Sequence, residues 1–159
     1  MADPDWQAAY KASEANGKLV NKVESVFTQA TDYSPTDETN PGGEPRVFEL
    51  RTYKAAPGKL NDLNARFRDH TCKLFEKHGI QNIGYGVPMD KDKGADDTLI
   101  YLVAHKSKEA AAESWKAFAA DPDWKKAKAE SEAKAGGPLT VEGGVKSAYL
   151  KATDYSPIK

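Results

Sequence analysis

The sequence is poor in cysteine and in long apolar runs, and each shortage excludes a class of protein. Cys72 is the single cysteine among 159 residues, so the chain cannot form an internal disulfide and suits a reducing compartment. No window approaches the roughly 18 consecutive apolar residues of a membrane helix, and the first residues lack the basic and apolar regions of a signal peptide. We therefore expect a cytoplasmic chain, while a leader removed from a longer gene product stays compatible with these residues.

The sequence also lacks an excess of charge of either sign. Its 23 lysines and arginines nearly balance 24 aspartates and glutamates, which leaves a net charge of −1. This balance argues against nucleic acid or an acidic membrane surface as a partner. The glycine-rich segments GGEP and AGGP lack the lysine and the following helix of a phosphate loop, and no zinc-ligand spacing is present. We expect neither a metal nor another cofactor.

What the sequence does contain is one segment twice. DPDWQAAYKASEA at 3–15 matches DPDWKKAKAESEA at 121–133, and ATDYSP occurs both at 30–35 and at 152–157. In each copy an aspartate suits the N-cap of a helix and the proline after it suits the first helical position. Each copy therefore predicts a helix, a loop and a strand.

The repeat divides the chain into unequal parts. The strands of the two copies are expected at 24–31 and 145–153, and each ends at Ser-Pro, which cannot extend a strand. We assign 1–35 to a partial repeat, 36–45 to a proline- and glycine-rich linker and 46–157 to a complete domain. Because the chain begins inside a repeat unit, a full first copy in a longer gene product is compatible with this division. Residues 3–35 are expected to pack as helix and strand against a sheet, in their own chain or in a partner. We expect their surroundings to resemble those of the second copy at 121–157.

The complete domain has the element order of a ferredoxin-like fold. Apolar patterning predicts strands at 47–53, 82–87, 98–105 and 145–153, a helix from Pro57-Gly58 to about 78, and helices at 108–120 and from 121. The order β-α-β-β-α-β, with its second helical region broken at Asp121-Pro122, is the split βαβ pattern. The fold class is therefore α+β, with an antiparallel four-stranded sheet, helices on one face, and an extra N-terminal helix-strand unit.

Strand alternation sorts the sheet residues into two faces. Phe48 and Leu50 are expected to face the helices, whereas the opposite set is expected on the open face. That set mixes large apolar and aromatic residues with a few polar ones: Val47, Glu49, Arg51, Tyr53, Ile83, Tyr85, Val87, Leu99, Tyr101, Val103, His105, Val145, Ser147 and Tyr149. A face so apolar predicts sheet-to-sheet association into a dimer or higher homo-oligomer, with a ligand site in the barrel between the sheets.

Seven residues of this face are the candidate ligand-binding set: Glu49, Arg51, Tyr53, Tyr85, Tyr101, His105 and Tyr149. Among them Arg51 could bind an anionic group, His105 could act as acid or base, and Tyr53 could shape a pocket, which makes these three the catalytic candidates. The competing interpretation, which we favour, is an ion pair between Glu49 and Arg51 or between strands, with His105 in water near a strand end.

Other conspicuous residues have simpler structural explanations. His70 and Cys72 point about 160° apart on their predicted helix, which argues against a shared metal site with His78. Trp6, Trp115 and Trp124 are expected to anchor helices. The repeated TDYSP is expected to tie down a terminal strand, although it could be a peptide that another protein recognises.

Four blocks in order, VFELRTYKAAPGKLNDLNARF, FEKHGIQNIGYGVP, TLIYLVAHKS and AFAADPDWKKA, resemble the NIPSNAP family over about 46–157. The resemblance implies a dimeric α/β-barrel member, often with tandem domains, and it carries no catalytic motif to this chain. It favours an assembly or small-ligand-binding module that associates through the open face of its sheet. The alternative is a cofactor-free monooxygenase-like enzyme acting on a small aromatic substrate, by analogy of fold.

Overall fold

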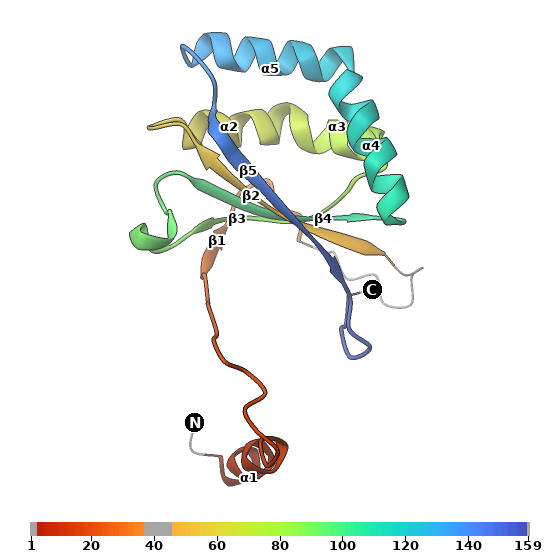
Figure 1. Cartoon of the computed structure of the whole chain (residues 1–159). Helices are drawn as coiled ribbons and strands as arrows, with labels where there is room; N and C mark the ends of the chain where they lie inside the picture. Colours follow the sequence, from red (N-terminus) through yellow and green to blue (C-terminus); the bar gives the residue numbers. More distant parts are fainter. Residues whose placement is uncertain (1–2, 37–45, 159) are drawn as a thin grey trace.

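The computed structural model describes residues 3–36 and 46–158, which form an antiparallel sheet, a helical layer on one face and an N-terminal arm (Figure 1). The elements in chain order are α1 (Pro4–Ser13), β1 (Thr28–Ala30), β2 (Val47–Ala55), α2 (Leu60–Arg66), the π-helical turn η1 (Phe67–Thr71), α3 (Cys72–Lys77), β3 (Gln81–Pro88), the 3-10 turn η2 (Lys91–Lys93), β4 (Thr98–His105), α4 (Lys108–Ala120), α5 (Pro122–Lys134) and β5 (Thr140–Lys151). The strands lie in the order β1-β3-β4-β2-β5, and each neighbouring pair is antiparallel.

The predicted α+β class is confirmed, and the sheet has five strands because β1 joins the four that were expected. The bounds of β4 and α4 agree with the sequence. The expected break between α4 and α5 is also present. There the Asp121 carboxylate accepts a hydrogen bond from the backbone N–H of Asp123 and lies 2.6 Å from His78 Nε2. The start of α5 is thereby tied to the end of α3.

The predicted long helix before β3 is interrupted by η1. Within this π-helical turn the Thr71 hydroxyl donates a hydrogen bond to the carbonyl oxygen of Arg66 at 3.1 Å. The wider turn changes the helical phase of the residues that follow it. Phe67 and Thr71, its first and last residues, are both 1% exposed. Apolar periodicity did not predict this change.

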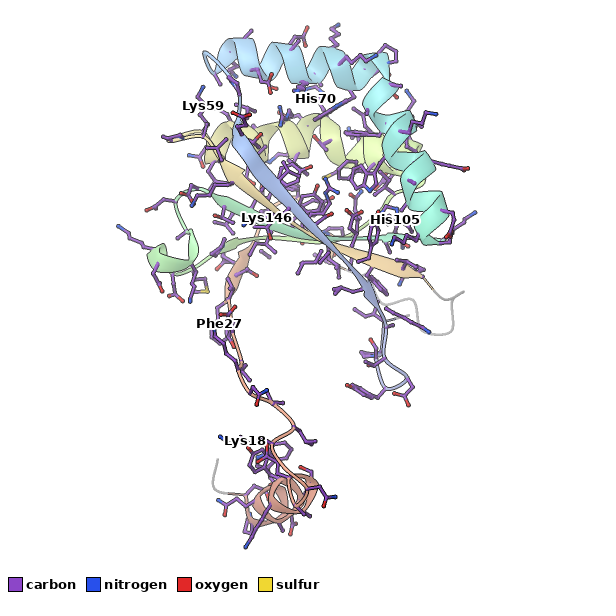
Figure 2. All side chains as sticks on the ribbon, viewed as in Figure 1. Lys18, Phe27, Lys59, His70, His105 and Lys146 are labelled. Atoms are coloured by element: carbon purple, nitrogen blue, oxygen red, sulfur yellow. The ribbon has the colours of Figure 1, made fainter. Side chains whose placement is uncertain are left out.

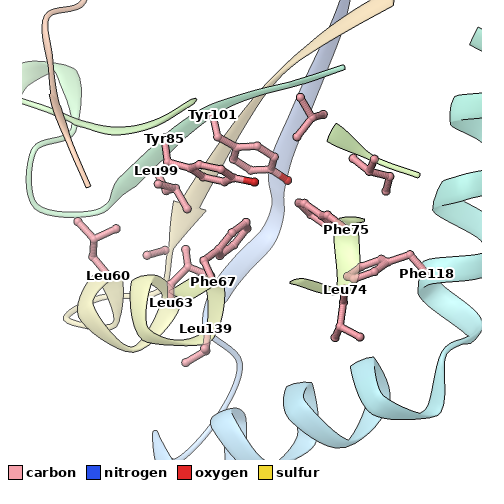
Figure 3. Packing of buried hydrophobic residues seen from close by; sticks show 13 residues of the cluster. Leu60, Leu63, Phe67, Leu74, Phe75, Tyr85, Leu99, Tyr101, Phe118 and Leu139 are labelled. Carbon is pink, nitrogen blue, oxygen red and sulfur yellow. The ribbon is translucent and has the colours of Figure 1, made fainter. Parts of the chain in front are cut away.

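The main core lies between the helices and the aromatic face of the sheet (Figure 3). Tyr101 and Phe67, each 1% exposed, lie at its centre with ring centroids 5.2 Å apart. The prediction that Tyr53, Tyr85 and Tyr101 lie on the open face is therefore wrong. Alternation separates two faces of a sheet but does not say which one the helices cover.

The open face carries a smaller apolar cluster. Phe48, Ile83 and Ala104 are buried there, with Ala152 and Ile158 of the C-terminal segment packed against them. Ile83 was expected on the same face as Tyr85, and this is wrong because the register of β3 on β4 shifts between Asn82 and Gly84. A β-bulge adds one residue and so changes which face the next side chain takes.

The N-terminal arm joins the sheet only through its last residues. Helix α1 stands away from the sheet and buries no residue, and Trp6 is 53% exposed, so this tryptophan does not anchor its helix in the domain (Figure 1). Phe27, on the extended segment that follows, is 71% exposed (Figure 2). β1 pairs with β3, whereas β5, which contains its sequence twin, pairs with β2 at the opposite edge. Within its own chain the arm therefore pairs with a different strand from the one that pairs with the second copy. The linker assigned to 36–45 lies outside the described residues except for Thr36.

Candidate functional site

A buried polar cluster lies between the sheet and α4, with Arg51 at its centre. Its guanidinium donates hydrogen bonds to three groups: Nη1 to Glu49 Oε1 at 2.5 Å, Nε to the Tyr101 hydroxyl at 2.9 Å and Nη2 to the Tyr53 hydroxyl at 3.2 Å. The guanidinium carbon also lies 4.2 Å from the centre of the Trp115 ring. This arrangement holds the cation by charge, by hydrogen bonds and by an aromatic face.

Glu49 is the anion of this cluster and is 1% exposed. Its second oxygen, Oε2, accepts hydrogen bonds from Trp115 Nε1 at 2.7 Å and lies 3.1 Å from His105 Nε2. Burial raises the pKa of the Glu49 carboxyl, but hydrogen bonds from His105 and Trp115 and the charge of Arg51 outweigh it and bring the pKa to about 2. The carboxylate is therefore charged at neutral pH.

Glu49, Arg51, Tyr53 and His105, which strand alternation puts on one face of the sheet, lie together under the helices of their own chain and not on the open face. The Glu49–Arg51 ion pair is present. His105 was expected in water, which is wrong, because it is 2% exposed and lies at the α4 end of the sheet (Figure 2). Its Nδ1 has no hydrogen-bond partner within the described part of the chain.

The two remaining candidate tyrosines lie at the margins of this arrangement. Tyr85 is 3% exposed and its hydroxyl donates a hydrogen bond to Asn82. Tyr149, on the edge strand β5, is 39% exposed, with its ring centroid 6.4 Å from that of His105. The structure thus brings five of the seven candidates together and leaves Tyr85 in the aromatic core and Tyr149 at the surface.

A cavity of about 270 Å³ lies beside this cluster, between α5, β5 and the aromatic core. We call it the α5 cavity. Its lining consists of Tyr53, Arg66, Phe67, Thr71, Phe75, Phe118, Trp124, Lys128, Glu132, Pro138, Thr140 and Val145. Tyr53 belongs to both the cluster and the cavity. The cavity therefore has aromatic walls and a few polar groups, which is the usual composition of a small-molecule site.

Arg66 is the polar group of the α5 cavity that has too few partners. It is 6% exposed, its Nη1 lies 3.5 Å from Glu132 Oε1, and its guanidinium carbon lies 5.2 Å from the centre of the Trp124 ring. Its Nε finds no acceptor among the residues that the structure describes. Burial lowers the pKa of Arg66 from its usual value, which reflects the cost of a charge removed from water.

The sequence analysis did not select Arg66, Phe67 or Thr71. One signal was present: Arg66 falls three residues after Leu63 and one before Phe67, and so interrupts the apolar face of a helix with a charge. Trp124 was expected to anchor its helix, and its ring centroid does lie 4.5 Å from that of Phe118.

Other parts of the surface offer less chemistry. A larger hollow of about 730 Å³ runs beside the start of α4 and the end of β5, but its lysines Lys106, Lys108 and Lys151 are exposed to solvent, so it is an open groove. His70 is exposed, and burial raises the pKa of the Cys72 thiol to about 11. Within residues 3–36 and 46–158 no three histidine, cysteine or acidic side chains are grouped to hold a metal ion.

The NIPSNAP family model matches residues 48–157. A crystal structure of a NIPSNAP family protein with unknown function from Agrobacterium tumefaciens is 19% identical, covers 73% of this chain and 96% of its own, and has a TM-score of 0.60. An uncharacterised NIPSNAP-like domain protein from Burkholderia xenovorans is 18% identical and covers 72% and 91%, with a TM-score of 0.59. At these identities the structures support the fold alone. No curated protein matches the sequence, and no helix among the described residues is long and apolar enough to cross a bilayer.

Proposed function

The chain belongs to the NIPSNAP family, and we propose that its domain binds a small aromatic carboxylate in the α5 cavity. The observation that carries this proposal is the buried guanidinium of Arg66, whose Nε has no acceptor among the described residues, in a cavity with aromatic walls. A buried cation with an unused donor favours an anion, because the interaction between opposite charges is stronger away from water. The sequence evidence for a reducing compartment leads us to place this function in the cytoplasm.

The size and the lining of the cavity restrict the ligand. A volume of about 270 Å³ admits one aromatic ring with a short acidic substituent. The ring would pack against Phe67, Phe75 and Trp124, and the carboxylate would pair with Arg66. Lys128 adds a second positive charge to the lining, whereas Glu132 competes with the ligand for Arg66. The ligand should therefore be a monoanion with a flat apolar body.

Titration calorimetry with benzoate and phenylacetate tests this proposal, with neutral benzamide as the control ligand. We expect the acids to bind at least tenfold more tightly than benzamide, and Arg66→Met to weaken them at least tenfold because it keeps an apolar side chain and removes the charge. Glu132→Gln should tighten binding, since it frees Arg66 from a competing carboxylate. Lys73→Met, which removes an exposed lysine from α3, should leave affinity unchanged. Equal binding of benzoate and benzamide would exclude Arg66 as the recognition group.

A second proposed function is self-association through the open face of the sheet. The observation that favours it is partial exposure of large apolar side chains on a face that no helix covers among the described residues: Leu50 is 38% and Leu150 is 44% exposed. Leu50→Asp should convert the associated chain to monomer in light scattering at fixed concentration, whereas Leu50→Met should preserve it. A chain that is monomeric before substitution would contradict this role.

The alternative activity, a cofactor-free oxygenase acting on an aromatic substrate, would use the same cavity. Of the three catalytic candidates only Tyr53 lines the cavity, and its hydroxyl accepts a hydrogen bond from Arg51. His105 acts on Glu49 and would influence a substrate only indirectly. Oxygen consumption with a phenolic acid, reduced at least tenfold by Tyr53→Phe, would support the enzyme. Binding of the acid without oxygen consumption would support the proposed ligand-binding function and not the enzyme.

A further inference from the structure

The two copies of ATDYSP lie in different surroundings, and the first copy fills a specific site. Asp32 accepts two hydrogen bonds from Arg68, from Nε and from Nη2, each at 2.7 Å. The Tyr33 hydroxyl donates to Asn64 Oδ1 at 2.7 Å, and its ring lies 5.3 Å from the ring of Tyr85. Carboxylate, hydroxyl and ring of one short segment are therefore each recognised by a separate side chain.

The backbone of the first copy is recognised as well. The Thr31 N–H donates to the carbonyl oxygen of Tyr85, and the Tyr85 N–H donates to the Ser34 hydroxyl, both at 3.0 Å. Gly86 allows this close approach, because a Cβ there would lie 2.8 Å from the Thr28 side chain. We call the surface formed by Asn64, Phe67, Arg68 and residues 84–86 the arm site. Its contacts match the features of the sequence ATDYSP one by one.

The second copy, at 152–157, has the same local shape but is not docked in this way. Its tyrosine, Tyr155, is 84% exposed. The N–H of Ser156 donates to the carbonyl oxygen of Thr153 at 3.1 Å, and in the first copy the N–H of Ser34 donates to Thr31 at the same distance. The exposed copy therefore already holds the turn that the arm site recognises, which lowers the entropic cost of docking.

We propose that the C-terminal ATDYSP is a docking segment whose acceptor is the arm site of a second copy of this chain, where it exchanges with that copy's own residues 30–35. The identical sequence supplies the same carboxylate, hydroxyl and ring to Arg68, Asn64 and Tyr85. The arm and the C-terminal segment both project from the side of the sheet opposite the helices, so each can reach a neighbouring molecule on that side (Figure 1). The result is a contact in which each chain can contribute a ligand and a site.

Competition between the two copies makes this contact conditional. The arm is tethered to the site that it fills, and a short tether gives it an effective concentration on the order of millimolar. The C-terminal copy of another molecule therefore wins only when the chains are concentrated or when the arm is released. We expect substitution of Tyr33 to weaken the docking of the arm, because it removes the hydroxyl and the ring that contact Asn64 and Tyr85. The competition between the two copies can then be measured.

The first experiment titrates a peptide of residues 150–158 into the ¹⁵N-labelled full chain that carries Tyr33→Ala and Tyr155→Ala. We expect saturable changes in the amide chemical shifts of Asn64, Arg68, Gly84 and Tyr85. A peptide that carries Tyr155→Ala should bind this chain at least tenfold more weakly. The unmodified peptide should likewise bind at least tenfold more weakly to a chain whose arm is intact. Should Tyr33→Ala unfold the domain, Asp32→Ala releases the arm at an exposed residue instead. Equal binding of the two peptides, or shifts confined to other surfaces, would overturn the proposal.

The second experiment tests the segment within the chain by sedimentation velocity. Tyr33→Ala is compared with Tyr33→Ala/Tyr155→Ala, both in a Leu50→Asp background so that association through the open face does not contribute. The first variant should form a species of at least twice the monomer mass in a concentration-dependent way, and the second should stay monomeric. Identical sedimentation of the two variants would show that the C-terminal copy is not a ligand of the arm site.

Discussion

The two faces of the sheet differ in a way that reverses the usual expectation for charge and burial. The face under the helices holds the ion pair of Glu49 and Arg51, and Glu49 is 1% exposed. Leu50 lies between these two residues in the sequence but points to the open face, where it is 38% exposed. The charges are tolerated because their hydrogen-bonding groups find partners in the surrounding side chains. The burial of Glu49 and Arg51 therefore rests on their hydrogen-bond and ion-pair partners on the helix-covered face.

Removal of the buried anion should have the largest effect on this comparison. Glu49→Ala leaves the charge of Arg51 buried without its counter-ion and takes away the acceptor of Trp115 and His105. We expect a loss of about 3–5 kcal/mol in the free energy of unfolding, the usual cost of breaking a buried ion pair from one side. Urea unfolding followed by tryptophan fluorescence measures it.

Thr52→Ala is the matched control for this prediction, because Thr52 lies on the same strand and faces the opposite side of the sheet. It should change the free energy of unfolding by less than about 1 kcal/mol. Equal losses for Glu49→Ala and Thr52→Ala would mean that the buried ion pair does not distinguish the two faces.

The architecture was predictable because its signals are local. Ser107 caps α4 through a hydrogen bond from the backbone of Ala110, and Asp121 with Pro122 opens α5, so both helices could be placed from the sequence. The assignment of the faces failed for a physical reason. A period of two gives the same pattern whichever side the helices cover, and the aromatic residues of that pattern belong to the buried side here.

The site was predictable only in part, for a different reason. Alternation brought Glu49, Arg51 and His105 onto one face, and the structure brings them into contact. The α5 cavity is lined by Phe67 and Thr71 of the π-helical turn and by Trp124 of α5, which lies more than 50 residues further along the chain. Apolar periodicity reveals neither the changed helical phase at the π-helical turn nor a contact between residues so far apart in the sequence.

Acid should destabilise the domain through Glu49 on the helix-covered face. The pKa of Glu49 is about 2 in the folded chain, below the 4.5 of an ordinary glutamate, so the unfolded chain binds a proton first as the pH falls. The contribution of Glu49 is complete above about pH 5 and is lost progressively as the pH approaches 2, on the order of 3 kcal/mol in all. Urea unfolding at a series of pH values between 7 and 3 measures the decline.

Other carboxylates also titrate in this range, so the share of Glu49 needs a variant that cannot titrate. Glu49→Gln keeps the size of the side chain and removes the ionisation. Its stability, already lower at pH 7, should fall less steeply than that of the unmodified chain between pH 5 and pH 3. Parallel profiles for the two chains would show that the acid sensitivity arises elsewhere, for example at Asp121, whose pKa is lowered by Lys77 and His78.

The last comparison sets a leucine of the core against a leucine of the open face. Leu63→Ala, at a leucine that is 0% exposed, should cost about 2–5 kcal/mol, the range for a buried leucine in a packed core. Leu50→Ala, at 38% exposure, should cost about 1 kcal/mol or less in dilute chain, because part of its surface is in water in both states. The measurement is urea unfolding at two protein concentrations that differ a hundredfold. A cost for Leu50→Ala that rises with concentration would show that another copy covers the open face, because only an associating chain buries this side chain further.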